Sequence, residues 1–239
     1  MKKIIQTSIF ICFVILISSC GEEESITPEI DNRLVDVDGN TYNTLKIGNQ
    51  TWMLENLKVT SFNDGTLITE YTSSENWNKE NRTFPFYQWA STSDLNNTVV
   101  EELPTDYYGM MYNHAAIQSG KLAPTGWRIP TEQDWIELKN FMASDGHTGN
   151  EAAALKSISG WSSFSGNGID AYGFNGLPNG YVDSNGTPKV DGIICTWATS
   201  NYDASQQTRR IINLFDESKI LFLNQSILLG AGIRCVKNE

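Results

Sequence analysis

The segment Gly126-Trp127-Arg128-Ile129-Pro130-Thr131-Glu132-Gln133-Asp134-Trp135 (GWRIPTEQDW) places two tryptophans, an arginine and two acids close together. This composition suits a binding surface, and it equally suits a strand end that runs into a capped helix. Thr131 can accept hydrogen bonds from the free N–H groups of a first helical turn, where the two acids favour the helix dipole. Apolar residues then recur at helical spacing, at Trp135, Leu138, Phe141 and Met142. The segment therefore predicts a strand end, a cap and an amphipathic helix over residues 131–143, with Trp127 and Trp135 in the core.

The start of the chain is predicted to be an export signal followed by a tether. Residues 1–19 begin with Lys2 and Lys3 and continue with an apolar run, ending at Ile17, that is too short to cross a bilayer. The run ends in Ile-Ser-Ser-Cys, which resembles the bacterial lipobox and predicts lipidation of Cys20; the alternative is a thiol near an ordinary cleavage site. Residues 20–33 predict an acidic tether, and its triplet Glu22–Glu24 either resembles a Bacteroidetes surface-export signal or is simply solvated. We expect a lipid-anchored protein of the outer membrane, exposed at the cell surface.

The charge balance narrows the range of partners. Without residues 1–19 the chain has 15 Lys and Arg against 28 Asp and Glu, a net charge of −13. Nucleic acid binding needs clustered cations, so it is excluded. An acidic surface favours neutral ligands, cations or other proteins, and the membrane is reached through the lipid anchor.

Two cysteines, Cys195 and Cys235, remain in the folded domain beyond the signal and the lipid site. In an oxidising compartment such cysteines can pair, and we treat them as a candidate disulfide. The alternative is two buried thiols, which spacing alone does not exclude.

Residues 34–239 predict a single α+β domain with short antiparallel strands, two helices and long ordered loops. Asp38-Gly39 and Gly48 mark hairpin turns at its start. Residues 61–108 lack sustained periodicity and predict long loops with short strands, and a second helix is expected over residues 150–157. The closing strands are expected at residues 193–199, 209–215, 219–223 and 232–236.

Aromatic residues in the loop region are the candidate ligand contacts. The run Phe84-Pro85-Phe86-Tyr87-Gln88-Trp89 is the densest aromatic cluster there, and Trp77 precedes it. We name Trp77, Tyr87 and Trp89 as candidates for binding a sugar. The alternative is that these rings form core beneath the loops, because aromatic side chains bury much area per residue.

Catalytic motifs are absent from the sequence, and we expect no enzyme activity. The chain has no G-x-S-x-G elbow, no H-E-x-x-H helix and no phosphate-binding loop. His114 and His147 each lack a second ligand at the short spacing of a zinc site. Carboxylate pairs could be imagined as acid and base, but glycosidase chemistry depends on their separation, which sequence does not give. These pairs are Glu101 with Glu102 and Asp134 with Glu137.

Calcium is the one cofactor that stays open; otherwise none is expected. Three stretches offer oxygen ligands at turn spacing, although Asx residues in turns more often bond to the backbone. They are residues 63–65, 94–97 and 183–186. The stretch Asp36-Val37-Asp38-Gly39-Asn40 does not match an EF-hand, because its glycine is fourth and no acid follows at the twelfth position.

Six short segments in order resemble one protein family. They are Asp38–Tyr42, Ile47–Leu57, Tyr108-Gly109 with Tyr112-Asn113, Ala123–Thr131, Tyr172–Phe174 with Leu177–Tyr181, and Gly232–Lys237. Together they resemble the Fibrobacter succinogenes major paralogous domain, which is common in lipoproteins of Bacteroidetes and Fibrobacteres.

The resemblance implies a fold similar to the C-type lectin-like and formylglycine-generating-enzyme group. It brings no settled activity, although cell-surface adhesion to polysaccharide is suspected for the family. His114 stands where relatives often have Trp, and Ala123 where they often have Cys, which would leave Cys195 as the candidate partner of Cys235. Copper-dependent oxidation of the formylglycine kind would need an adapted cysteine pair, and the surrounding motif is missing.

Three classes of function follow from these observations. We expect a non-catalytic cell-surface binding module for polysaccharide or adhesion. The alternative is a structural or assembly component of the outer membrane, and an enzyme comes last.

Overall fold

The structure, a computed structural model, describes residues 33–72, 77–80, 82–90, 103–190, 192–216 and 218–239. The chain folds there as α+β, as predicted. The predicted signal peptide, Cys20 and nearly all of the predicted tether lie outside the described residues. None of the helices within these ranges has the length and apolar character needed to cross a bilayer.

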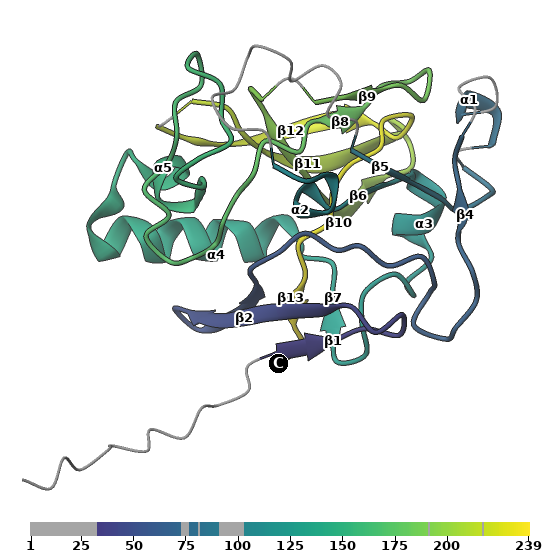
Figure 1. The fold of residues 1–239 in the computed structure, drawn as a ribbon, viewed down its shortest axis with the longest axis horizontal. Coiled ribbons are helices and arrows are strands. Elements are labelled where there is room, and N and C mark those ends of the chain that lie inside the picture. Colours follow the sequence, from purple (N-terminus) through teal and green to yellow (C-terminus); the bar gives the residue numbers. More distant parts are fainter. Residues whose placement is uncertain (1–32, 73–76, 81, 91–102, 191, 217) are drawn as a thin grey trace, which may run out of the picture. The chain divides into compact units, whose positions relative to one another are not determined.

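The elements follow one another along the chain in an order that mixes short helices with strands (Figure 1). They are β1 (Arg33–Val35), β2 (Thr41–Ile47), β3 (Gln50–Met53), β4 (Thr69–Glu70), α1 (Trp77–Glu80), β5 (Phe86–Trp89), α2 (Thr105–Tyr108), β6 (Met110–Tyr112), α3 (His114–Gln118), β7 (Trp127–Arg128), α4 (Glu132–Met142), the π-type turn η2 (Ala143–His147), α5 (Glu151–Leu155), β8 (Tyr181–Val182), β9 (Pro188–Lys189), β10 (Cys195–Asp203), β11 (Thr208–Leu214), β12 (Ile220–Ser226) and β13 (Val236–Lys237).

The first sheet joins the two ends of the domain, with the strand order β1-β2-β3-β13-β7. Its hairpins turn at Gly39 and Gly48, whose φ angles of 83° and 63° favour glycine, as the sequence indicated. Asp36 stabilises the first turn, because its Oδ1 accepts hydrogen bonds from the N–H groups of Asp38 and Asn40. The DVDGN stretch is therefore a turn, and β13 lies between two segments that are remote from it in sequence.

The second sheet consists of β10, β11 and β12, which are consecutive antiparallel strands. Three of the four predicted closing strands form this sheet, although β10 begins at Cys195 and runs on to Asp203, and β12 runs on to Ser226. Of the strand predicted at residues 232–236, only residue 236 is in a strand, in β13. Two smaller sheets, β4-β5-β6 and β8-β9, complete the fold.

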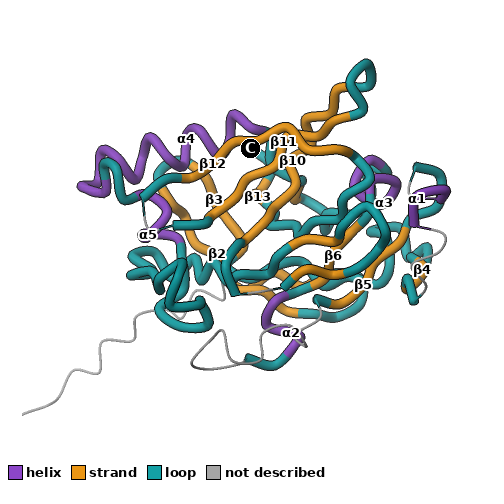
Figure 2. Tube along the Cα trace, turned by 90° about the horizontal axis from the view of Figure 1, so that it is seen from above, coloured by secondary structure: helices purple, strands orange, loops and turns teal. Residues whose placement is uncertain are grey.

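Helix α4 packs between the first sheet and the second sheet, where aromatic rings fill the space. The ring of Trp135 stacks on Trp197 of β10, with centroids 5.2 Å apart, and its centroid lies 4.7 Å from that of Trp52 in β3. All three tryptophans are fully buried. Such pairs contribute about 0.5–1.5 kcal/mol beyond their area burial. Both views place α4 and α5 at one side of the domain and α1 and α3 at the other (Figures 1 and 2).

The helix prediction was right for α4 and α5 and missed the other helices of the described residues. Helix α4 lies within the predicted 131–143, with Thr131 and Ala143 as its caps, and α5 lies within the predicted 150–157. The structure adds α1, α2 and α3, which have four or five residues each and show no helical periodicity for a sequence to reveal. The expectation of purely antiparallel strands also needs correction, because β4 pairs with β5 in parallel.

Candidate functional site

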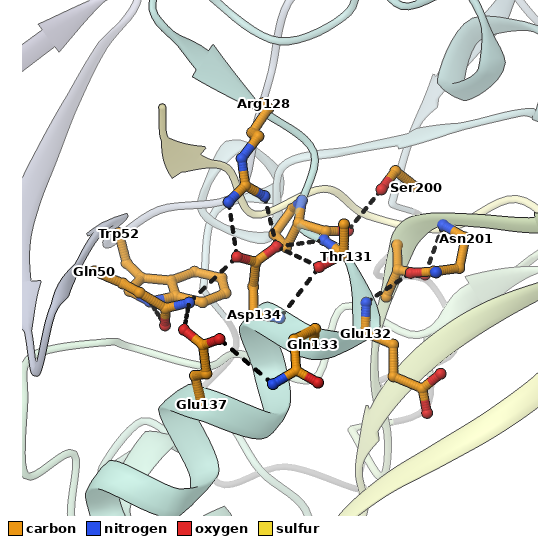
Figure 3. Close-up of polar contacts among 12 residues, drawn as sticks. Gln50, Trp52, Arg128, Thr131, Glu132, Gln133, Asp134, Glu137, Ser200 and Asn201 are labelled. Carbon is orange, nitrogen blue, oxygen red and sulfur yellow. Dashed lines mark hydrogen bonds and ion pairs between the residues drawn. The ribbon is translucent and has the colours of Figure 1, made fainter. Parts of the chain in front are cut away.

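The GWRIPTEQDW segment is organised around the carboxylate of Asp134 (Figure 3). Arg128 donates to it twice, from Nη1 to Oδ2 at 2.5 Å and from Nη2 to Oδ1 at 2.7 Å. Thr131 caps α4: its Oγ1 accepts from the N–H of Asp134, and Asp134 accepts in return from the N–H of Thr131 at 2.6 Å. Burial alone would raise the pKa of Asp134, but hydrogen bonds from Arg128 and Thr131 outweigh it and lower the pKa.

The same segment is tied to β10 and β11. Glu132 forms an ion pair with Arg210, Oε1 to Nη2 at 2.6 Å, and its N–H donates to Asn201 Oδ1 at 2.6 Å. Trp135 is fully buried, and half-buried Trp127 packs against the core next to a hollow of about 370 Å³. Arg128, Thr131, Glu132 and Asp134 bond to one another and to neighbouring strands, as the residues of a scaffold element do.

The closing motif Gly232–Lys237 has a similar structural role, centred on Arg234. Its guanidinium is almost completely buried, donates to Asn56 Oδ1 at 3.0 Å and to the Phe174 carbonyl at 2.6 Å, and lies 5.3 Å from the centroid of the Trp197 ring. Trp197 donates to the same Asn56 oxygen at 2.7 Å. These contacts link the N-terminal half of the domain to its last strands.

The predicted aromatic candidates do not form one exposed platform. Trp77 is fully buried and its indole N–H donates to the carbonyl of Leu228 at 2.6 Å, so this ligand-binding candidate presents no exposed ring to a sugar. Tyr87 is 9% exposed and belongs to the core, while Trp89 packs against the same cluster and is partly exposed. Trp77 and Tyr87 therefore fit the alternative interpretation, in which these rings form core beneath the loops, because neighbouring elements cover them.

The candidate disulfide is absent, and the alternative of two buried thiols is what the structure has. Cys195 and Cys235 are both free and fully buried. They lie in different core clusters, Cys195 with Trp135 and Trp197, and Cys235 with Tyr112. Burial raises the pKa of both thiols above its ordinary value, so neither is a ready thiolate.

The carboxylates and histidines considered from sequence are engaged elsewhere or lie outside the described residues. Asp134 is bonded to Arg128, and Asp183 Oδ1 accepts from the N–H groups of Asn185 and Thr187, as an Asx turn does. The described ranges contain no group of three or more His, Cys, Asp or Glu side chains placed to hold a metal ion. The stretch 94–97 and the pair Glu101 and Glu102 fall outside those ranges.

A cavity of about 470 Å³ lies against one face of the β10-β11-β12 sheet. Alternation along the strands separates the two faces: Trp197 and Ile212 point to the core, and their neighbours Ala198 and Ile211 point to the cavity. The cavity floor is formed by Thr196, Ala198, Arg209, Ile211, Asn213 and Leu223. Its walls come from α3, from β8 and the turn after it, and from residues 226–231.

Two buried polar atoms in this floor have no hydrogen-bond partner in the described part of the chain. They are Thr196 Oγ1 and Asn213 Oδ1, on residues that are each 3% exposed. The two residues are directly opposite in the β10–β11 register, yet they do not bond to each other. An unsatisfied buried polar group costs about 1–3 kcal/mol, so a partner from the cavity is the expected remedy.

The third polar feature of the floor is Arg209, which is 4% exposed. It donates from Nη1 to the Thr199 carbonyl at 2.8 Å and from Nη2 to Gln118 Oε1 at 3.1 Å, and its Nη2 lies 2.9 Å from Nδ1 of His114. An arginine can only donate, so His114 accepts at Nδ1. Burial and the neighbouring Arg209 lower the pKa of His114 to about 4, which keeps this acceptor neutral.

Sequence reasoning named none of Thr196, Arg209 and Asn213 as site residues. Each is a polar residue in a strand whose other face is apolar, a pattern shared by any strand with one solvated face. These three residues differ from those on a solvated face because α3 and β8 cover the second face of their sheet. This burial arises from tertiary packing, which the local sequence does not show.

Comparison with known proteins identifies the family. The model of the Fibrobacter succinogenes major domain matches residues 45–237, so the chain belongs to this family. The match spans both the GWRIPTEQDW segment and the strands that form the cavity floor. Searches among curated proteins and among solved structures found no match.

Proposed function

We propose that this protein is a non-catalytic binding module whose ligand occupies the cavity on the β10-β11-β12 sheet. The observation that carries the proposal is the pair of unpartnered buried atoms, Thr196 Oγ1 and Asn213 Oδ1, in the cavity floor. The volume of about 470 Å³ is in the usual range for small-molecule sites, which combine apolar walls with a few placed polar groups.

The lining of the cavity supports binding rather than catalysis. Its ionisable side chains are Arg209, which stays charged because burial lowers its pKa only to about 10, and Asp183, which is held in a turn. Tyr181 also lines the wall. General acid–base chemistry needs a group that exchanges protons near neutral pH, and Arg209, with a pKa of about 10, is not such a group.

The setting that we propose for this module is the cell surface. In this proposal the domain has a C-type lectin-like fold, Cys20 carries the lipid that anchors it in the outer membrane, and the ligand is an extracellular glycan or a smaller molecule. The second candidate is a structural or assembly component of the outer membrane. It is favoured by the GWRIPTEQDW segment, because the residues of this segment contact the core and neighbouring strands and form no ligand site of their own.

A binding screen of residues 21–239, with and without calcium, tests the proposal. Glycans, plant polysaccharides and small organic acids and alcohols would be titrated against the wild type and two variants. Leu223 lines the cavity and is 38% exposed, so Leu223→Trp puts an indole into the opening without overpacking the core. Leu45 in β2 of the first sheet is also 38% exposed and is not part of the lining, so Leu45→Trp is the matched control.

The outcomes separate the candidates. Saturable binding that Leu223→Trp weakens and Leu45→Trp leaves unchanged supports the cavity as the site. Binding that is indifferent to both variants would place the site elsewhere and turn attention to Trp89. No binding in the whole screen, together with co-purification of envelope proteins, would favour the assembly role.

A further inference from the structure

We propose that the ligand of this cavity is a molecule with an aliphatic middle, a carboxylate that binds Arg209, and a hydroxyl that bonds to Thr196 and Asn213. The proposal rests on the binding function above and specifies the chemistry of the ligand. It follows from where the polar groups stand along the sheet and from what each of them still lacks.

The polar groups are at two ends of the floor, with apolar side chains between them. Thr196 is opposite Asn213 in the register of β10 and β11, and Arg209 is four residues from Asn213 on β11. At about 3.3 Å per residue, the two ends are roughly 13 Å apart along the strand. The space between them is floored by Ala198 and Ile211, so the cavity has a polar end, an apolar middle and a cationic end.

Arg209 supplies the cationic end. Three of its five N–H groups are directed at the Thr199 carbonyl, Gln118 and His114, so the guanidinium is fixed in place and two N–H groups are left over. Arg209 forms no ion pair in the described ranges, although the residue is only 4% exposed. A buried cation without an opposite charge is costly, and a carboxylate in the cavity would compensate it.

Asp183 is the acidic group that lines the same cavity, and it does not neutralise Arg209. Its Oδ1 accepts two backbone N–H groups of its own turn, and its Oδ2 lies 4.0 Å from Nζ of Lys189. The positive charge at Arg209 therefore remains available to a ligand, although the chain as a whole is acidic.

The other end requires a hydrogen-bond donor. Asn213 Oδ1 can only accept, whereas the hydroxyl of Thr196 can both donate and accept. A ligand hydroxyl satisfies both, because it donates to Asn213 Oδ1 and accepts from Thr196 Oγ1. A second carboxylate at this end would leave Asn213 Oδ1 facing another acceptor, so a diacid fits less well than a hydroxy acid.

Three probes of equal chain length test this assignment on residues 21–239. They are ω-hydroxydecanoate, which has both end groups, decanoate, which lacks the hydroxyl, and decanediol, which lacks the carboxylate. Calorimetric titration gives their relative affinities for the wild type. We expect ω-hydroxydecanoate to bind about 10- to 100-fold more tightly than decanediol, since a hydrogen-bonded charge is worth about 1.5–3 kcal/mol. Decanoate should bind more weakly than the hydroxy acid by about 5-fold or more.

Variants locate the two end groups. Arg209→Gln should remove the preference for the carboxylate, while Arg210→Gln, on the other face of the same strand, should keep it. Asn213→Leu should remove the preference for the hydroxyl. Thermal unfolding verifies that each variant is folded, and the order of the three probes on the wild type stands as a test even where a variant does not fold.

The outcomes distinguish this proposal from the function on which it rests. Equal affinity for decanediol and ω-hydroxydecanoate, or a carboxylate preference that survives Arg209→Gln in a folded protein, overturns the assignment of the ligand and leaves the cavity as a site. The ligand assignment is also overturned if none of the three probes binds while Leu223→Trp blocks the binding of another screened compound. If Leu223→Trp blocks no compound, both proposals fail.

Discussion

Replacing Asp134 by alanine should destabilise the domain without changing what it binds. The carboxylate caps α4 and holds Arg128, and the side chain is 9% exposed. Loss of the cap costs about 1 kcal/mol. Loss of two charge-assisted hydrogen bonds to Arg128, which is 36% exposed, adds about 2 kcal/mol after allowance for solvent screening. The expected loss in the free energy of unfolding is about 3 kcal/mol, or a fall in Tm of roughly 6–12 °C for a domain of this size.

Urea unfolding followed by tryptophan fluorescence measures this loss, since Trp52 and Trp135 lie beside the network. Glu137→Ala, one turn further along α4, is the matched control: Glu137 accepts only from the exposed Nε2 of Gln50 at 3.3 Å and of Gln133 at 3.4 Å. This control should cost less than about 0.5 kcal/mol.

The effect of Asp134→Ala should also depend on pH in a defined direction. The pKa of Asp134 is lowered in the folded state, so its contribution is complete above the unfolded pKa of about 3.9 and is lost as the pH falls through the folded pKa. The difference between wild type and variant should therefore shrink below about pH 4. A variant within 1 kcal/mol of the wild type, or one that keeps its stability and loses ligand binding, would contradict the view that this segment is scaffold.

Three further predictions concern the core and the cavity wall. The pKa of His114 is lowered to about 4 in the folded domain, whereas in the unfolded chain it is about 6.5. Between these values only the unfolded chain binds the proton, so the free energy of unfolding should decrease as the pH falls from about 6.5 to about 4. His114→Gln should remove this part of the pH dependence. Cys195 and Cys235 should resist a thiol reagent in the native protein and both react after unfolding in urea, whereas two unreactive positions after unfolding would reveal a disulfide. Gly180→Ala should cost more than about 3 kcal/mol, because the new Cβ would collide with a carbonyl of β9, while Gly173→Ala, at a similar φ but with open space, should cost about 1 kcal/mol; equal losses in thermal unfolding would refute the collision.

The parts of the fold that could be predicted are those with local causes. The cap at Thr131 and the periodic apolar face after it lie within one stretch of chain, so helix α4 was placed to within a residue at each end. Strand β10 was ended too early, at residue 199, because its last residues are polar and extend past the core. They are held by a hairpin turn in which Asp203 Oδ1 accepts from the N–H groups of Ser205 and Gln206.

The candidate site could not be predicted from the sequence, because its residues come together only in the fold. Thr196 and Asn213 become neighbours only through the register of two strands, and their burial depends on α3 and β8, which come from distant parts of the chain. The aromatic residues that sequence favoured, Trp77 and Tyr87, are conspicuous as letters but are covered in the fold. Composition therefore favoured aromatic side chains, whereas the polar residues of the cavity floor are Thr196, Arg209 and Asn213.

The position of β13 sets a condition on how this domain matures. Val236 pairs with Trp52 of β3 and with Arg128 of β7, so the strand that connects the two halves of the first sheet is the last of the described elements to leave the ribosome. Until then β3 and β7 have no shared neighbour, and the domain cannot close around its tryptophans. Non-local pairing slows folding in general, so we expect the first sheet to close only after synthesis has passed β13. An open chain is also the form that can be threaded through a narrow translocation channel.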